Sequence, residues 1–163
     1  MLQHEKPHIQ HYRLQDLNVS AKSVAEFIAF RISADGELMQ NIKSIALNNG
    51  IVSGMVLMMI GTLKKARIGW YNTEKGEFEV AEYDGGLELT SGSGSISMEN
   101  DVLVPHIHIT IADKNNNAFG GHLFEDTIVK EYIEGTMIHL KDIFMRRIYD
   151  ERVGASPLSM QKL

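Results

Sequence analysis

The amino-acid sequence predicts an α+β domain built on a largely antiparallel, strongly bent β-sheet with one main helix. Residues 51–140 show short segments of β-type character separated by turns. One amphipathic stripe with helical spacing precedes them, over residues 35–49. The 163-residue length and the hydrophobic fraction of 44% are typical of one globular domain with a core of its own.

Residues 24–32 are expected to form the first strand, with Phe27, Ala29 and Arg31 on one side. In the helix that follows, Asp35 is expected to be the N-cap and Glu37 to favour the positive end of the helix dipole. Asn49-Gly50 ends this helix. The apolar stripe of the helix consists of Leu38, Ile42, Ile45 and Ala46.

From residue 51 onward, glycines and polar clusters separate the predicted strands. The expected breaks are Gly61, residues 72–76, Gly85-Gly86 and residues 98–101. The predicted strands are residues 51–60, 62–71, 77–83, 86–97, 102–112, 118–124 and 127–140.

The domain is expected to span residues 19–150, between a flexible N-terminal arm and a C-terminal tail. Residues 1–18 form the arm and residues 151–163 form the tail. The arm carries His4, His8 and His11, which we interpret as tail histidines rather than as a folded ligand set.

The composition of the chain argues against disulfide-bonded, membrane-spanning and nucleic-acid-binding proteins. The chain has no cysteine, which excludes disulfides and thiolate zinc sites and fits a cytoplasmic protein. No apolar run is long enough to span a membrane, so we expect no membrane partner. The formal net charge of −5 does not favour nucleic-acid binding, because such proteins usually carry a basic balance or patch.

The most informative segment is a predicted hairpin that carries three histidines. In a strand over residues 104–111, His106 and His108 lie on one side and isoleucines on the other. Residues 113–117 have the composition of a turn. If Ala112 pairs with Ala118, then His108 lies directly opposite His122, with His106 two residues along the same face.

Three imidazoles without a fourth protein ligand are typical of an open metal site, where water or a ligand completes the coordination sphere. Imidazole suits zinc, nickel, copper or iron, and the spacing does not choose among them. The alternative is a solvated polar face, with Gly120-Gly121 serving only a bulge or a close backbone approach.

Several segments together resemble the plants-and-prokaryotes-conserved (PPC) family, over roughly residues 25–140. They are Phe30-Arg31-Ile32 with Gly36-Glu37-Leu38, Ile60-Gly61-Thr62-Leu63, residues 83–89, residues 91–97, His106-Ile107-His108 and Gly120-Gly121-His122-Leu123. The resemblance implies an α/β fold, a homotrimer, and a metal held at the three histidines, as in several prokaryotic members.

The resemblance also singles out Glu134 and Glu88, which occupy positions where the family carries glutamates. Either is a candidate catalytic base, fourth ligand or imidazole partner beside the metal. The alternative is an exposed strand glutamate. Arg31 is a candidate for binding an anion near the metal, or for tying neighbouring subunits together.

Plant relatives join this domain to an AT-hook with an Arg-Gly-Arg-Pro core, and no such motif stands in these 163 residues. A plant Gly-Arg-Phe-Glu-Ile-Leu stretch implicated in partner binding reads Gly85-Gly86-Leu87-Glu88-Leu89-Thr90 here, so Gly86 replaces the arginine. Asp126 stands where many relatives have glycine.

We therefore expect a standalone, homotrimeric PPC-like domain with a divalent transition metal, zinc first, at His106, His108 and His122. It would bind a small ligand or a protein partner in a process, regulatory or other, that the sequence does not name. One alternative is the DNA-associated regulator that the usual family label suggests, although we expect DNA binding to be weak or absent. The other is a metal-dependent hydrolase or lyase.

Overall fold

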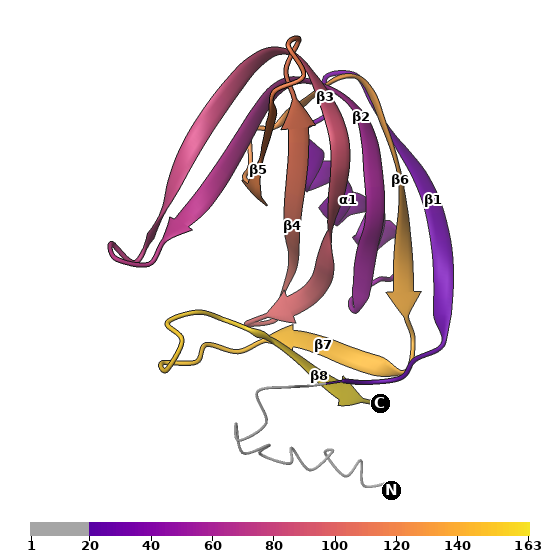
Figure 1. Ribbon diagram of the computed structural model, residues 1–163. Helices are drawn as coiled ribbons and strands as arrows, with labels where there is room; N and C mark the ends of the chain where they lie inside the picture. Colours follow the sequence, from indigo (N-terminus) through magenta and orange to yellow (C-terminus); the bar gives the residue numbers. More distant parts are fainter. Residues whose placement is uncertain (1–19) are drawn as a thin grey trace, which may run out of the picture.

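The computed structural model describes residues 20–163, and this part of the chain forms one strongly curved β-sheet with a helix packed behind it (Figure 1). The strand order is β1-β6-β2-β5-β4-β3-β7-β8, and β2 also pairs with β3. The elements are β1 (Ala25–Ser33), α1 (Leu38–Asn48), β2 (Gly54–Asn72), β3 (Glu77–Glu99), β4 (Val102–Ala112), β5 (Ala118–Leu123), β6 (Ile128–Leu140), β7 (Ile143–Arg147) and β8 (Leu158–Lys162).

The prediction of a largely antiparallel, bent sheet with one main helix is confirmed. Among these strands the pairings are antiparallel, except for a parallel contact between β3 and β7. Four strands close into a ring, because β2 pairs with β3, β3 with β4, β4 with β5, and β5 again with β2. Core side chains fill its inside, including Leu89, Ile107, Ile109, Ile111 and Leu123.

The helix begins two residues later than predicted. Its N-cap is Glu37, whose carboxylate accepts hydrogen bonds from the backbone N–H groups of Met39 at 3.3 Å and Gln40 at 2.6 Å. Asp35 was the wrong choice because it adopts a positive φ of 65° and its carboxylate pairs with Lys64. The helix buries Leu38, Ile42 and Ala46 against the sheet.

Two predicted strand breaks are also wrong. Gly61 and Gly85 lie inside β2 and β3, where positive φ angles of 144° and 111° let a continuous strand bend. The register of β2 against β6 shifts just after Gly61, as expected for such a bend. The breaks at residues 72–76 and 98–101 are confirmed, since β2 ends at Asn72 and β3 ends at Glu99.

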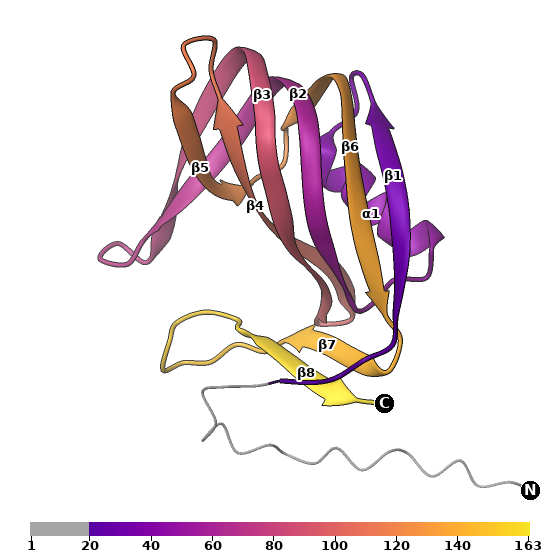
Figure 2. The same cartoon turned by 45° about the vertical axis from the view of Figure 1, so that its right-hand side comes forward.

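A C-terminal hairpin of β7 and β8 lies across one end of the sheet (Figure 2). The sequence analysis did not predict these strands, and it placed the residues of β8 in a tail. The hairpin is anchored through Ser53, whose hydroxyl accepts from the Met145 N–H at 2.8 Å and whose carbonyl accepts from the Leu140 N–H at 2.9 Å. The expected arm over residues 1–18 lies outside the described residues.

Strands β3 and β4 leave no room for a side chain at Gly94, which faces Ile107. A Cβ atom here would overlap the carbonyl oxygen of His106 and lie 2.8 Å from the Cα of Ile107. We therefore expect Gly94→Ala to lower the free energy of unfolding by about 2–3 kcal/mol, because backbone cannot yield as a flexible side chain can. Urea denaturation measures the effect.

Gly86→Ala on the same strand is the matched control. A Cβ at Gly86 meets the Lys130 Nζ at 3.5 Å, which is ordinary contact, so the free energy of unfolding of Gly86→Ala should change by less than about 0.5 kcal/mol. Equal midpoints for the two variants would contradict the packing described for Gly94.

Candidate metal centre

The β4–β5 hairpin has the register that the sequence predicts. Ala112 pairs with Ala118, and His108 lies opposite His122. The turn is held by Asp113, whose Oδ1 accepts from the backbone N–H groups of Asn115 at 2.8 Å and Asn117 at 2.9 Å. These short-range bonds fix which residues of the two strands face each other.

The two faces of β4 differ as expected for an amphipathic strand. Ile107, Ile109 and Ile111 are at most 2% exposed and belong to the core. His106 points to the other face and is partly buried, while His108 is exposed. Burying the isoleucines therefore forces the imidazoles outward.

The three rings gather into one cluster. Ring centroids lie 5.3 Å apart for His106 and His108, 4.9 Å for His106 and His122, and 5.4 Å for His108 and His122. One potential ligand nitrogen from each ring lies within 4.8 Å of the others. Within residues 20–163, this group of potential metal ligands contains no carboxylate.

Close backbone contact and aromatic packing position His122. A Cβ at Gly121 would lie 2.6 Å from the Gly69 carbonyl oxygen, so glycine lets β5 approach β2 there. The Phe124 ring covers the place where Gly69 has no side chain. The His122 ring packs against Phe78 and Phe124, each with a centroid distance of 5.0 Å. This apolar wall limits the orientations open to the imidazole.

The surroundings favour neutral imidazoles. Burial, followed by the positive charges of Arg147 and the other two histidines, lowers the pKa of His106 to about 4. Burial, His108 and Arg147 also lower the pKa of His122 below its ordinary value. A metal ion binds the neutral form of histidine, so these two ligands are ready to coordinate near neutral pH.

The residues fit a metal ion both in the state of the His122 ring and in the spacing of the potential ligand nitrogens. Nδ1 of His122 is buried without a hydrogen-bond partner, and an ion bound there would relieve a desolvation cost of about 1–3 kcal/mol. Nitrogen ligands about 2.1 Å from a tetrahedral ion lie roughly 3.4 Å from one another, so the cluster has to contract slightly. The exposed ring of His108 has the freedom to do so.

The structure does not bring the other candidate residues to this cluster. Arg31 and Glu134 are exposed and face each other across the β1–β6 pair, which β2 separates from the histidine hairpin. Glu88 pairs with Ala112, four residues along β4 from His108, which corresponds to about 13 Å. These positions give no support to Glu134 or Glu88 as a base, or to Arg31 as an anion ligand, at the histidines.

Sequence reasoning missed polar side chains on the adjacent strand. Ser93 lies opposite His108 and Ser95 opposite His106, so these serines share the face of the imidazoles. The turn expected at residues 98–101 could have predicted these serines, because a two-residue turn between β3 and β4 fixes the pairing of the two strands. Arg147, which donates to the Ser95 hydroxyl at 3.0 Å, gave no local signal of this kind.

One member of the cluster, His122, borders open space. A hollow of about 280 Å³ lies between the edge of β4, the helix and the segment after β5, and His122 and Phe124 line it. Val104 and Pro105 form the β4 side of this hollow, and Met39 belongs to the helix side. A small molecule can therefore reach the neighbourhood of His122.

One curated protein resembles most of the chain. The bifunctional protein GlmU of Synechococcus sp. (strain JA-2-3B'a(2-13)) is 24% identical over 131 residues, which cover 80% of this chain. The match covers 20% of GlmU, so the chain spans about a fifth of the length of this curated relative.

Two solved structures share the fold across nearly their whole length. A plant- and prokaryote-conserved (PPC) protein of Pyrococcus horikoshii has a TM-score of 0.79 and 28% identity, covering 90% of this chain and 100% of its own. The metal-containing protein AF0104 of Archaeoglobus fulgidus has a TM-score of 0.80 and 27% identity, covering 88% of this chain and 99% of its own.

A family model matches residues 19–138, a range that contains β1 through most of β6 and therefore all three histidines. Its description is Plants and Prokaryotes Conserved (PCC) domain, the family also abbreviated PPC. The matched range covers more than half of the chain and agrees with the two structural relatives. The chain belongs to the Plants and Prokaryotes Conserved family.

Proposed function

We propose that this chain holds one divalent transition metal, zinc first, between His106, His108 and His122, and presents it to a small ligand or a protein partner. The observation that carries the proposal is the convergence of three potential ligand nitrogens within 4.8 Å. The name of the Archaeoglobus relative, a metal-containing protein, supports it. The buried Nδ1 of His122 without a hydrogen-bond partner is the complementary observation from this chain.

Three protein ligands leave a coordination position for water or for an atom of the bound ligand. The hollow of about 280 Å³ beside His122 gives such a ligand a route to the metal. A binding role needs nothing more than these features.

A metal-dependent hydrolase or lyase would need a general base near the metal-bound water. The histidine cluster includes no carboxylate from residues 20–163, and Glu88 and Glu134 pair elsewhere in the sheet. We therefore favour binding over catalysis.

A role as a DNA-associated regulator is the second alternative. The formal net charge of −5 opposes it, because the DNA backbone is itself negative. A salt titration distinguishes DNA binding from its absence, since real phosphate contacts make the logarithm of affinity fall by about 0.9 per contact for each logarithmic unit of salt.

The part of the chain that the structure describes, residues 20–163, contains no helix with the length and apolar character of a membrane span.

We also propose that the chain assembles as a homotrimer. Large apolar side chains are exposed on three neighbouring strands, among them Phe27 at 70%, Ile60 at 44% and Tyr132 at 50%. Exposed apolar groups on adjacent strands are typical of a surface that another chain covers. Light scattering is expected to give a mass three times the 18.3 kDa of the chain, and a stable monomer at micromolar concentration would contradict the trimer.

The three histidines should act as one metal site. Replacing His108 or His122 with alanine is expected to abolish stoichiometric zinc binding, because two imidazoles hold a metal much less tightly than three. His106→Ala should also weaken binding, though less severely. Elemental analysis of protein washed with chelator and reloaded with zinc measures the loss, and the assembly should persist because the core lies on the opposite face of β4.

His139→Ala is the matched control, since His139 lies on β6 near Glu26 and outside the cluster. It should retain the wild-type amount of zinc. Retention of zinc by both His108→Ala and His122→Ala would refute the site and implicate His4, His8 and His11, which lie outside the described residues. A wild-type protein that takes up no zinc, nickel, copper or iron would also refute it.

Stability of the metal-free protein should depend on pH through His106. Because its folded pKa is about 4 and its ordinary value is 6.5, the unfolded chain takes up a proton first as the pH falls. This residue's contribution to stability is therefore lost as the pH falls from about 6.5 towards 4, and His106→Gln should show a shallower decline. Thermal unfolding across this window measures it, and parallel curves would show that His106 is not shielded in solution.

A further inference from the structure

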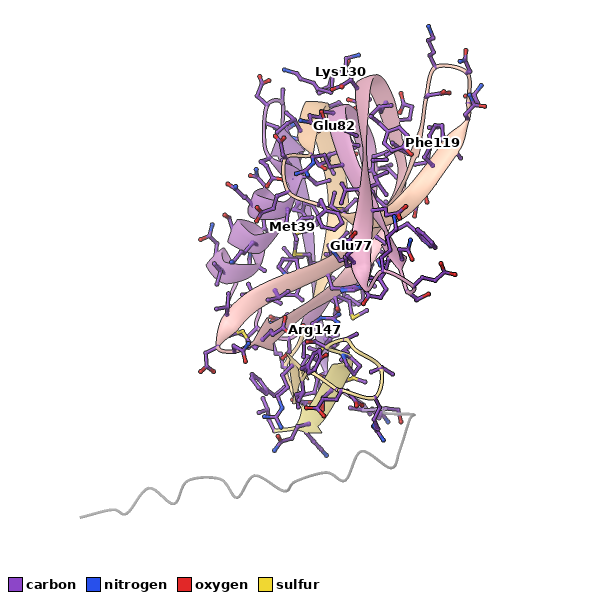
Figure 3. All side chains as sticks on the ribbon, turned by 90° about the vertical axis from the view of Figure 1, so that its left-hand side faces the viewer. Met39, Glu77, Glu82, Phe119, Lys130 and Arg147 are labelled. Atoms are coloured by element: carbon purple, nitrogen blue, oxygen red, sulfur yellow. The ribbon has the colours of Figure 1, made fainter. Side chains whose placement is uncertain are left out.

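Arg147 brings a fixed positive charge to the histidine face. It is the last residue of β7, and it lies where the C-terminal hairpin meets the body of the sheet (Figure 3). Its Nη2 donates to the Ser95 hydroxyl at 3.0 Å, and its Nη1 donates to the Ser156 carbonyl at 2.9 Å. Because Ser95 pairs directly with His106, the guanidinium is held one strand away from the cluster.

The charge of Arg147 is not neutralised within residues 20–163 by a carboxylate at ion-pair distance. Glu99 is the acidic group whose charge acts on it most, without forming such a pair. Nε of Arg147 is buried and has no hydrogen-bond partner. Partial burial of a guanidinium with unused donors is costly unless an anion completes its contacts.

Serine hydroxyls extend this polar face. Ser95 is 5% exposed and Ser97 is fully buried. They are two residues apart on β3, so both lie on the sheet face that carries the histidines of β4. Oγ of Ser97 has no hydrogen-bond partner, although a buried hydroxyl normally has one. This second buried polar group without a partner is independent of Arg147, and it lies on the same face.

There is room beside the guanidinium. Arg147 lines a hollow of about 310 Å³ between the β3–β4 turn and the C-terminal hairpin. Met98, Phe144 and Tyr149 supply apolar surface to this hollow, and its charged lining also includes Glu99, Asp101 and Arg146. The guanidinium therefore borders open space on the side of the β3–β4 turn.

We propose that the ligand of this site is a small oxyanion, a carboxylate or a phosphate, bound between the metal and Arg147. This inference rests on the proposed metal site. A planar guanidinium can donate hydrogen bonds to two oxygens of one oxyanion. A further negatively charged oxygen of the same anion can occupy the open coordination position of the metal. The Ser95 hydroxyl, which pairs with His106 and accepts from Arg147, supplies a neutral donor between the two positive groups.

A purely structural role is the alternative, because Arg147 also ties the C-terminal hairpin to β3 through Ser95. That role explains two of its donors. It leaves unexplained the buried Nε and the lack of a carboxylate partner at ion-pair distance, and a bound oxyanion would account for both.

The test is titration calorimetry of zinc-loaded protein with inorganic phosphate and, separately, with acetate. Arg147→Gln is expected to weaken binding of the preferred anion at least tenfold, while the zinc content per chain stays at the wild-type level. Arg147→Lys keeps the charge without the planar fork and should weaken binding several-fold. The stronger of the two anions identifies whether the site is built for phosphate or for carboxylate.

Arg31→Gln is the matched control, because Arg31 is exposed opposite Glu134 and β2 separates this pair of strands from the histidine hairpin. It removes the same charge from the chain and should change anion affinity less than twofold. If Arg147→Gln fails to fold, Arg147→Lys and Ser95→Ala supply the comparison, and each should still weaken binding. Equal affinity in the wild type and in the folded Arg147 and Ser95 variants would overturn the inference.

The outcomes separate this inference from the metal site. Normal zinc content without measurable phosphate or acetate binding would overturn the oxyanion site and leave the metal site standing. If the wild type binds no zinc, the proposed function fails, and the metal-free protein is titrated instead. Anion binding that is then lost in Arg147→Gln would support the Arg147 half of the site, and its absence would overturn that half too.

Discussion

The antiparallel register of β3, β4 and β5 is the constraint on which the rest of the site depends. It places Ser95 opposite His106 and His108 opposite His122. A one-residue slip would expose Ile107 and bury its neighbours instead. Burial of each isoleucine is worth about 1.5–3 kcal/mol, so the core on one face fixes the positions of the imidazoles on the other.

The fixed positive charge of Arg147 lies beside this face of a chain whose formal net charge is −5. Burial lowers the pKa of His106 and His122, and the positive charge of Arg147 lowers both further. A bound divalent ion would add further positive charge. The local electrostatics therefore differ from what the composition of the chain indicates, and they favour a negatively charged ligand.

Features set by nearby residues were predictable from the sequence. The turn held by Asp113 fixes the β4–β5 register within a few residues, so the histidine cluster could be anticipated. Glycines misled the analysis, because Gly61 and Gly85 bend long strands without ending them. The position of Arg147 depends on a contact with Ser95, 52 residues away in the chain, and no local pattern encodes such a contact.

The proposed site joins two parts of the fold that are also linked by hydrogen bonds at Ser53 and Ser95 and by the parallel contact between β3 and β7. The histidines belong to the closed ring of β2, β3, β4 and β5, whereas Arg147 belongs to the C-terminal hairpin. An oxyanion held by the metal and by Arg147 would add a bond between these parts. Any ligand that binds the connected arrangement more tightly stabilises it by mass action, so occupancy of the proposed site would be thermodynamically coupled to docking of the hairpin.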